Sequence, residues 1–225
     1  MNIFVSSQYK EQKIYSTQAV KKFLLSSGAA ILLAVGAQAQ TEFGLKAGVN
    51  LASYSYGDPE ALSEAKPIVS YYAGGYLDAR IVRGFHLYPE ISLQGKGARV
   101  VKFAELGGSE IIQRTNWLDF VFNFIGKVPV GDLGNVFGGA GPYLGFAMNG
   151  ENTYPDGSTS AVIIYKENLK SIDYGVNCMA GLRLGQRLTL NANYRLGVAN
   201  ISNSSNKWSN NIKNQVLSLG IGVVL

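Results

Sequence analysis

The sequence predicts an all-β fold: an eight-stranded antiparallel up-and-down transmembrane β-barrel preceded by a cleaved signal peptide. Three observations predict it, namely an apolar export segment, eight segments in which apolar and polar residues alternate, and connections that are alternately long and short. The 225 residues suit one domain or two small ones. The 27 glycines suit strands that turn or pack tightly.

A secretory signal peptide is predicted over residues 1–39. Two lysines precede an apolar run at residues 23–35, and a small-x-small motif follows that run. A transmembrane anchor is the alternative, but the run is short and contains Gly and Ser. The predicted cleavage site comprises Ala37, Ala39 and Gln40. Residues 40–225 then form the barrel domain.

The 19 residues before Val20 are unusual for a signal peptide, so we expect translation to start at Val20, with residues 1–19 an over-extended start. Cleavage removes four lysines and one glutamate and lowers the net charge from +5 to +2. The basic balance is therefore no argument for a nucleic-acid partner. Cys178 is the one cysteine, which excludes an internal disulfide.

Eight segments alternate between apolar and polar residues with the two-residue period of a β-strand. Each has about 10–13 residues, long for a soluble strand but suited to a tilted membrane crossing. No helical segment of convincing length competes with them. The segments are residues 43–53, 71–81, 86–96, 116–128, 136–148, 172–184, 188–197 and 214–225.

The connections alternate in length along the chain. Short ones such as "VRG" and "GQR" join strands two to three, four to five and six to seven, whereas long polar ones join the remaining pairs. Outer-membrane barrels show this pattern, with short periplasmic turns and long extracellular loops. We therefore expect both termini on the periplasmic side. Aromatic residues near the strand ends are consistent with interface girdles.

A barrel in a membrane turns its apolar side chains to lipid and its charges inward. In "HLYPEISLQGK", Ile91 and Leu93 should then contact lipid, while Glu90 and Lys96 point into the barrel. An eight-stranded barrel is just filled by side chains, so inward charges must pair. The predicted interior charge network has four acids and six bases: Lys46, Asp78, Arg80, Glu90, Lys96, Asp119, Lys127, Asp173, Arg183 and Arg195.

Several motifs, including "YPEISLQGKGA", "WLDFVFNF", "GAGPYLGF" and "IDYGVNCMAGLRL", resemble the PorT-like outer-membrane β-barrel family of Bacteroidetes. The resemblance covers essentially the whole mature chain. It implies an eight-stranded barrel in the outer membrane of a Gram-negative cell envelope and no shared enzymatic activity. The chain departs from the pattern at Leu225, because such barrels often end in an aromatic residue that the insertion machinery reads.

Catalytic, cofactor and metal sites are not predicted. His86 is the one histidine and Cys178 the one cysteine, so no His/Cys metal site can form. The glycines of "GGAGPYLG" lack the spacing of a phosphate-binding loop and precede a strand, so close interior packing explains them better. Acidic residues in the long loops show no ligand pattern.

The expected function is non-enzymatic: a structural role, or binding of a ligand or partner through the long extracellular loops. The expected partners are outer-membrane lipid, the barrel insertion machinery and an extracellular ligand or envelope protein. Tyr54, Tyr56, Tyr154 and Trp208 are candidate loop contacts. The alternatives are a narrow porin-like channel or an accessory subunit of a protein export system, a lipid-modifying barrel enzyme, and a secreted soluble barrel.

Overall fold

The computed structural model describes residues 41–57, 63–102, 110–161, 169–203 and 211–225. The compact unit that contains them is Thr41–Leu225. The predicted signal peptide and its cleavage site at Ala37, Ala39 and Gln40 lie outside the described residues. No helix in the described part of the chain is long and apolar enough to cross a membrane.

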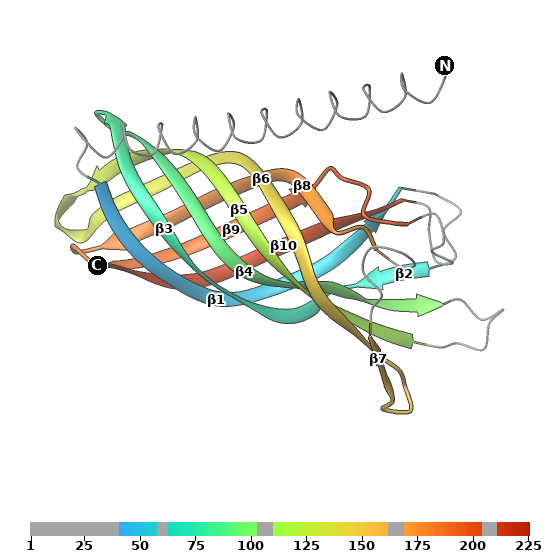
Figure 1. Ribbon diagram of the computed structural model, residues 1–225. Coiled ribbons are helices and arrows are strands. Elements are labelled where there is room, and N and C mark those ends of the chain that lie inside the picture. The colour runs from blue at the N-terminus through green and yellow to red at the C-terminus, as the bar shows by residue number, and fades with distance from the viewer. Residues whose placement is uncertain (1–40, 58–62, 103–109, 162–168, 204–210) are drawn as a thin grey trace, which may run out of the picture. The chain divides into compact units, whose positions relative to one another are not determined.

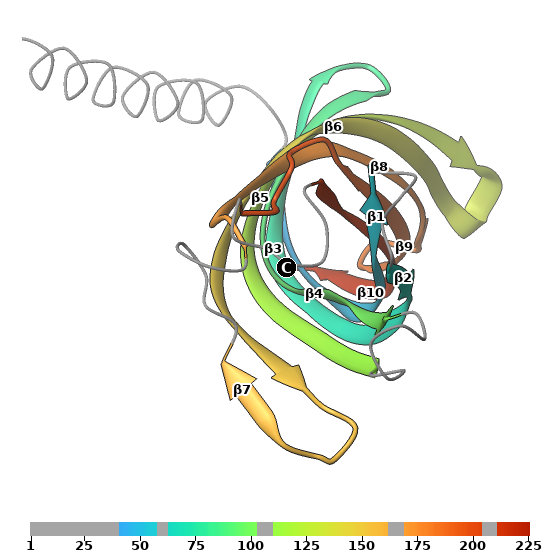
Figure 2. The same ribbon diagram turned by 90° about the vertical axis from the view of Figure 1, so that its right-hand side faces the viewer.

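Eight long strands form a closed ring, as Figures 1 and 2 show. Each pairs in antiparallel fashion with the strand before and after it, and the ring closes where the first strand pairs with the last. The eight-stranded up-and-down barrel predicted from the sequence is confirmed. The strands are β1 Thr41–Tyr56, β3 Ile68–Val82, β4 Phe85–Lys102, β5 Glu110–Val130, β6 Gly134–Thr153, β8 Ile172–Leu184, β9 Leu188–Gly197 and β10 Ile212–Val224.

The connections at one end of the barrel are tight turns. Gly84, between β3 and β4, and Gly185, between β8 and β9, have positive φ angles of 80° and 58°, which residues with a Cβ rarely adopt. A 3₁₀ turn, η2 Gly131–Leu133, joins β5 to β6. We call this the turn end of the barrel.

The opposite end, which we call the loop end, carries the longer connections and two short strands. β2 Ser63–Lys66 pairs with β4, and β7 Thr159–Ala161 pairs with β6. β5 and β6, with 21 and 20 residues, are longer than β8, β9 and β10, with 13, 10 and 13. One side of the barrel wall therefore extends further at the loop end than the other (Figure 1).

The two faces of the barrel wall carry opposite kinds of side chain. Large apolar side chains point outward, such as Phe43 and Ile91 with exposed fractions of 59% and 53%. Inward side chains on the same strands are polar or charged and buried, such as Lys46 and Glu90 at 3% and 2%. A protein folded in water would reverse this arrangement, whereas a barrel surrounded by lipid requires it.

Candidate functional site: the filled interior

Six buried charges form an alternating chain in the middle of the barrel, and we call them the charge layer. Lys46 Nζ lies 2.6 Å from Glu90 Oε2, and Arg195 Nη2 lies 2.9 Å from Glu90 Oε1. Arg195 Nε lies 3.6 Å from Asp119 Oδ2, which lies 3.0 Å from Lys96 Nζ. Lys96 Nζ then reaches Asp173 Oδ2 at 3.0 Å. The members are Lys46, Glu90, Arg195, Asp119, Lys96 and Asp173.

The charge layer has three basic and three acidic members from five strands, β1, β4, β5, β8 and β9. Each basic member lies next to one or two acids, so the layer has no net positive or negative region. This arrangement matters because an unpaired charge buried away from water costs several kcal/mol. Antiparallel strands that are distant in sequence supply these partners, so the pairs also tie the two sides of the barrel together.

Neutral groups complete the shell of the charge layer around Asp173. Tyr143 Oη and Asn214 Nδ2 donate hydrogen bonds to its Oδ2 at 3.0 and 2.9 Å. The ammonium group of Lys96 lies 5.0 Å from the ring centroids of both Trp117 and Tyr143, which is a cation–π distance. Lys96 therefore has two carboxylates and two aromatic faces in place of water.

Inward glycines make room for large side chains. At Gly220 an added Cβ would lie 2.1 Å from Tyr72 Oη, and at Gly44 it would lie 2.2 Å from Tyr76 Cζ. The Tyr72 hydroxyl continues past Gly220 and donates to Asn191 Oδ1 at 2.6 Å. These rings lie over neighbouring strands of the inner wall, where the glycines have no side chain, so the glycines permit an interior filled to packing density.

An apolar group, the turn-end cluster, fills the barrel below the charge layer. Tyr76 and Tyr88 stack with ring centroids 4.6 Å apart. Outside this cluster, Asp78 pairs with Lys127 and lies 2.6 Å from His86 Nδ1, and Arg183 pairs with Glu42. The turn-end cluster consists of Tyr76, Tyr88, Ile125, Phe137 and Met179.

A second apolar group, the apolar plug, fills the loop end. Three of its members belong to connections rather than to the eight strands: Leu169, Ala199 and Ile201. Backbone hydrogen bonds hold them, because Lys170 N donates to Ile201 O and Ile201 N donates to Ile212 O, both at 2.8 Å. The whole plug consists of Tyr54, Ala98, Val100, Trp117, Ala147, Leu169, Ala199, Ile201 and Ile212.

Strand β4 alone shows the order of these groups along the barrel. From the turn end it contributes Tyr88 to the turn-end cluster, Glu90 and Lys96 to the charge layer, and Ala98 and Val100 to the apolar plug. All five are nearly or fully buried. The interior is therefore filled in sequence by apolar, charged and apolar groups.

The family described as outer membrane protein beta-barrel domain matches residues 37–203, most of the chain. The chain belongs to this family. The outer membrane is its location, and the apolar outer belt faces lipid. This match does not distinguish the PorT-like family of Bacteroidetes from other outer-membrane barrels.

Solved structures of similar architecture come from three bacteria. Neisserial surface protein A (NspA) is 15% identical, with coverage of 80% of this chain and 96% of that one and a TM-score of 0.44. Ail of Yersinia pestis is 9% identical, with coverage of 82% and 99% and a TM-score of 0.41. OprG of Pseudomonas aeruginosa is 12% identical, with coverage of 82% and 95% and a TM-score of 0.40. A search of curated proteins found no match.

In this outer-membrane barrel, nine of the ten charges predicted for the interior point inward. Six form the charge layer, Asp78 is buried beside Lys127 near the turn end, and Arg183 is half-buried there. Glu42, which was not among the predicted interior charges, forms an ion pair with Arg183. The inward alternation continues from Lys46 through Gly44 to Glu42, and this pattern could have revealed it.

The structure corrects the placement of Arg80, which is exposed. Two-residue alternation puts Arg80 on the same face as Asp78. However, the pairing of β3 with β4 becomes irregular between Arg80 and Val82, and β3 ends at Val82. At this rim the barrel no longer encloses the side chain. With Glu42 added and Arg80 removed, the inward acids and bases are five of each.

Tyr54 also differs from its sequence interpretation as a loop contact. It is 4% exposed, belongs to the apolar plug, and donates a hydrogen bond to Gln113 Oε1 at 2.7 Å. Tyr154 lies in the turn between β6 and β7, whereas Trp208 lies outside the described residues. The candidate contact surface is therefore formed by the connections at the loop end, where Tyr154 lies, and not by the inside of the barrel, where Tyr54 is buried.

The described residues contain no group of three or more His, Cys, Asp or Glu side chains that could hold a metal ion. Cys178 is exposed on the outward face of β8. The interior acids contact cations and hydrogen-bond donors. The arrangement therefore acts chemically as a packed polar core.

Proposed function

We propose that this outer-membrane barrel is sealed and non-enzymatic, and that it carries its long connections at the cell surface for a structural or binding role. The observation that supports this most is the continuous filling of the interior by the turn-end cluster, the charge layer and the apolar plug. The plug uses connection residues to close the loop end, so an ion that enters the barrel from this end meets apolar side chains before it reaches the charge layer.

Recording from the purified protein in a planar bilayer tests the sealed interior. We expect no steady unitary conductance. A double variant, Trp117→Ala with Ile201→Ala, removes two large members of the plug but leaves the charge layer and the turn-end cluster, so it should also show no conductance if it keeps the folded electrophoretic mobility. Steady conductance from the unaltered protein would contradict the proposal and favour the narrow-channel alternative.

We also propose that the turn end faces the periplasm, so that both termini lie there and the loop end is extracellular, because short periplasmic turns are usual in such barrels. The turn between β6 and β7 is the clearest projecting element. Within it Asp156 Oδ1 accepts hydrogen bonds from the Ser158 amide and hydroxyl at 2.8 and 2.6 Å, and these bonds lower the pKa of the Asp156 carboxyl. Protease cleavage of this turn on intact cells, with the turn end protected, is the expected result.

A role as an accessory subunit of an export system is the alternative. Affinity capture from detergent-solubilised outer membrane separates the candidates. Envelope proteins that co-purify in fixed proportion would favour the accessory role. A surface polymer or external protein would favour binding. Loss of a lipid-modifying activity when one loop acid is neutralised would instead support an enzyme.

A further inference from the structure

The outer belt of the barrel has a depression at the middle of two adjacent strands. The outward row of β1 reads Phe43, Leu45, Ala47, Val49 and Leu51, and the outward row of β3 reads Val69, Tyr71, Ala73, Gly75 and Leu77. Both rows are bulky at their ends and small at their centres. Ala47 lies opposite Ala73, so the small central positions of the two rows meet, and Gly75 extends the small stretch on β3 opposite Leu45.

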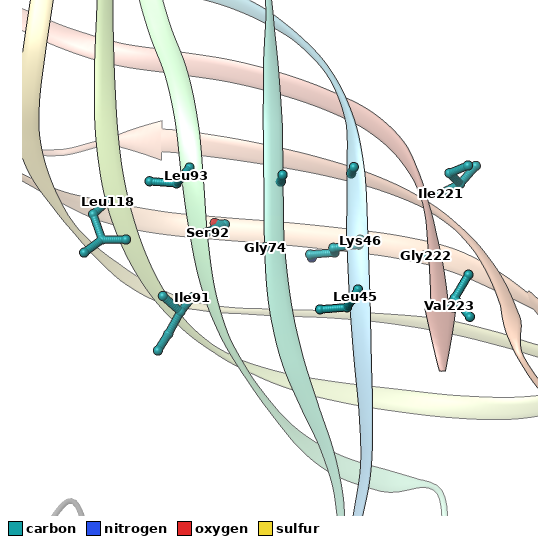
Figure 3. A pocket seen from close by; sticks show the side chains of 12 residues that line it. Leu45, Lys46, Gly74, Ile91, Ser92, Leu93, Leu118, Ile221, Gly222 and Val223 are labelled. Atoms are coloured by element: carbon teal, nitrogen blue, oxygen red, sulfur yellow. The ribbon is translucent and has the colours of Figure 1, made fainter. Parts of the chain in front are cut away.

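Larger side chains from the neighbouring strands border this depression and make it a groove of about 640 Å³, within the range of small-molecule sites. Ile221 and Val223 of β10 lie on one side, and Ile91 and Leu93 of β4 lie on the other (Figure 3). The backbone of β1 and β3 forms the floor, because the Lys46 side chain points inward. We call this the β1–β3 groove.

Its depth in the membrane identifies the chemistry of the occupant. The groove lies at the centre of the outward apolar rows, so it lies near the middle of the lipid-facing belt. A polar headgroup cannot reside there, because desolvation without a partner is costly. Side chains on both flanks stand above the Ala–Gly floor, so a second barrel, which is convex, would rest on the rims and leave the floor empty. A flexible hydrocarbon chain can reach the floor.

We propose that the β1–β3 groove holds an acyl chain of a membrane lipid, which makes it a lipid-binding site on the outer belt of the barrel. The groove is continuous with the lipid-facing surface that membership of the outer-membrane family establishes. A chain seated in it gains contacts with the floor and both walls, whereas a chain beside a bulky row touches one surface. This chain exchanges more slowly than its neighbours.

Photocrosslinking tests the site on the full barrel. The protein is reconstituted in vesicles of phosphatidylethanolamine and phosphatidylglycerol that contain a trace of phospholipid with a diazirine in its acyl chain. After irradiation, mass spectrometry maps the adducts. We expect several-fold more adducts on groove residues than on Leu144 of β6 and Val176 of β8, which are 40% and 44% exposed and belong to strands that do not border the groove.

A matched pair of variants makes the test specific. Gly75→Leu places a leucine between Leu45 and Ile91, which both line the groove, and an added Cβ there meets no atom closer than 3.7 Å. Gly138→Leu adds the same side chain on the outward face of β6, where the nearest atom to a Cβ is 3.6 Å away. The enrichment should disappear in the first variant and persist in the second. Ala73→Leu replaces Gly75→Leu if that variant does not fold.

Two results would overturn the proposal. Equal labelling of groove residues and of Leu144 and Val176 would show that the groove has no preference for lipid. Crosslinks between two copies of the protein at the groove, lost in the filled variant, would assign the groove to a second barrel. Neither result depends on the conductance or the loop function, so failure of the groove and failure of the sealed-barrel proposal are distinguishable.

Discussion

The charge layer and the apolar plug fill the same barrel in two different ways. The charge layer uses side chains of the wall alone, and each member depends on a partner of opposite sign on another strand. The plug combines wall residues with Leu169, Ala199 and Ile201 from the connections, and any apolar neighbour of suitable size satisfies them. Pairing is therefore specific in the middle of the barrel, whereas packing is adaptable at the loop end.

The largest expected effect comes from breaking the charge layer. Lys96→Met should destabilise the barrel by about 3–5 kcal/mol, because among the described residues it leaves Asp119 without its closest cation and Asp173 without any. Urea unfolding in lipid vesicles measures this loss.

The control for this variant is Arg99→Met on the same strand. Arg99 pairs with Glu110 at 2.8 Å, but both side chains are more than 40% exposed. Removal of such an exposed pair should cost roughly 0–1 kcal/mol. Similar losses in the two variants would show that burial does not set the strength of the pairs and would contradict the comparison.

Substitutions in the plug should lower the free energy of unfolding less than the loss of Lys96 does. Ile201→Ala leaves a cavity among apolar neighbours and should cost about 2–4 kcal/mol, with part of the cost relieved because a connection can relax. Ile201→Leu keeps the volume and should cost about 1 kcal/mol or less. Unfolding in vesicles measures both. Equal costs for the Ala and Leu variants would show that the plug does not pack as described.

The barrel interior also depends on glycines that admit aromatic rings, and a single methyl group tests this. Gly220→Ala would bring a Cβ within 2.1 Å of Tyr72 Oη and 2.4 Å of the Ala47 carbonyl oxygen. We expect a loss of about 1–3 kcal/mol from overpacking. Gly75→Ala, which adds the same methyl group on the outward face, is the control and should be nearly neutral. The difference in unfolding free energy between the two variants is the measurement.

The sequence predicted the charge layer well and the plug poorly, for a physical reason. Two-residue alternation assigns every strand side chain to one face, so all six members of the charge layer followed from the pattern together with the membrane setting. Leu169, Ala199 and Ile201 lie outside the alternating segments, and their positions depend on backbone hydrogen bonds between two connections. The alternating pattern ends the first strand at residue 53 and so leaves Tyr54 in a loop. In the structure β1 continues to Tyr56, because it pairs with β10 as far as Ile212.

The smallest expected effect concerns Arg80, where alternation failed. Because Arg80 is exposed at the rim, Arg80→Met should change the unfolding free energy by about 0.5 kcal/mol or less. Lys127→Met, which removes the buried Asp78 partner at the same end, should cost more. If Arg80→Met were as damaging as Lys127→Met, Arg80 would belong to the interior network after all. The two variants together therefore locate the boundary at which the barrel wall stops enclosing its charges.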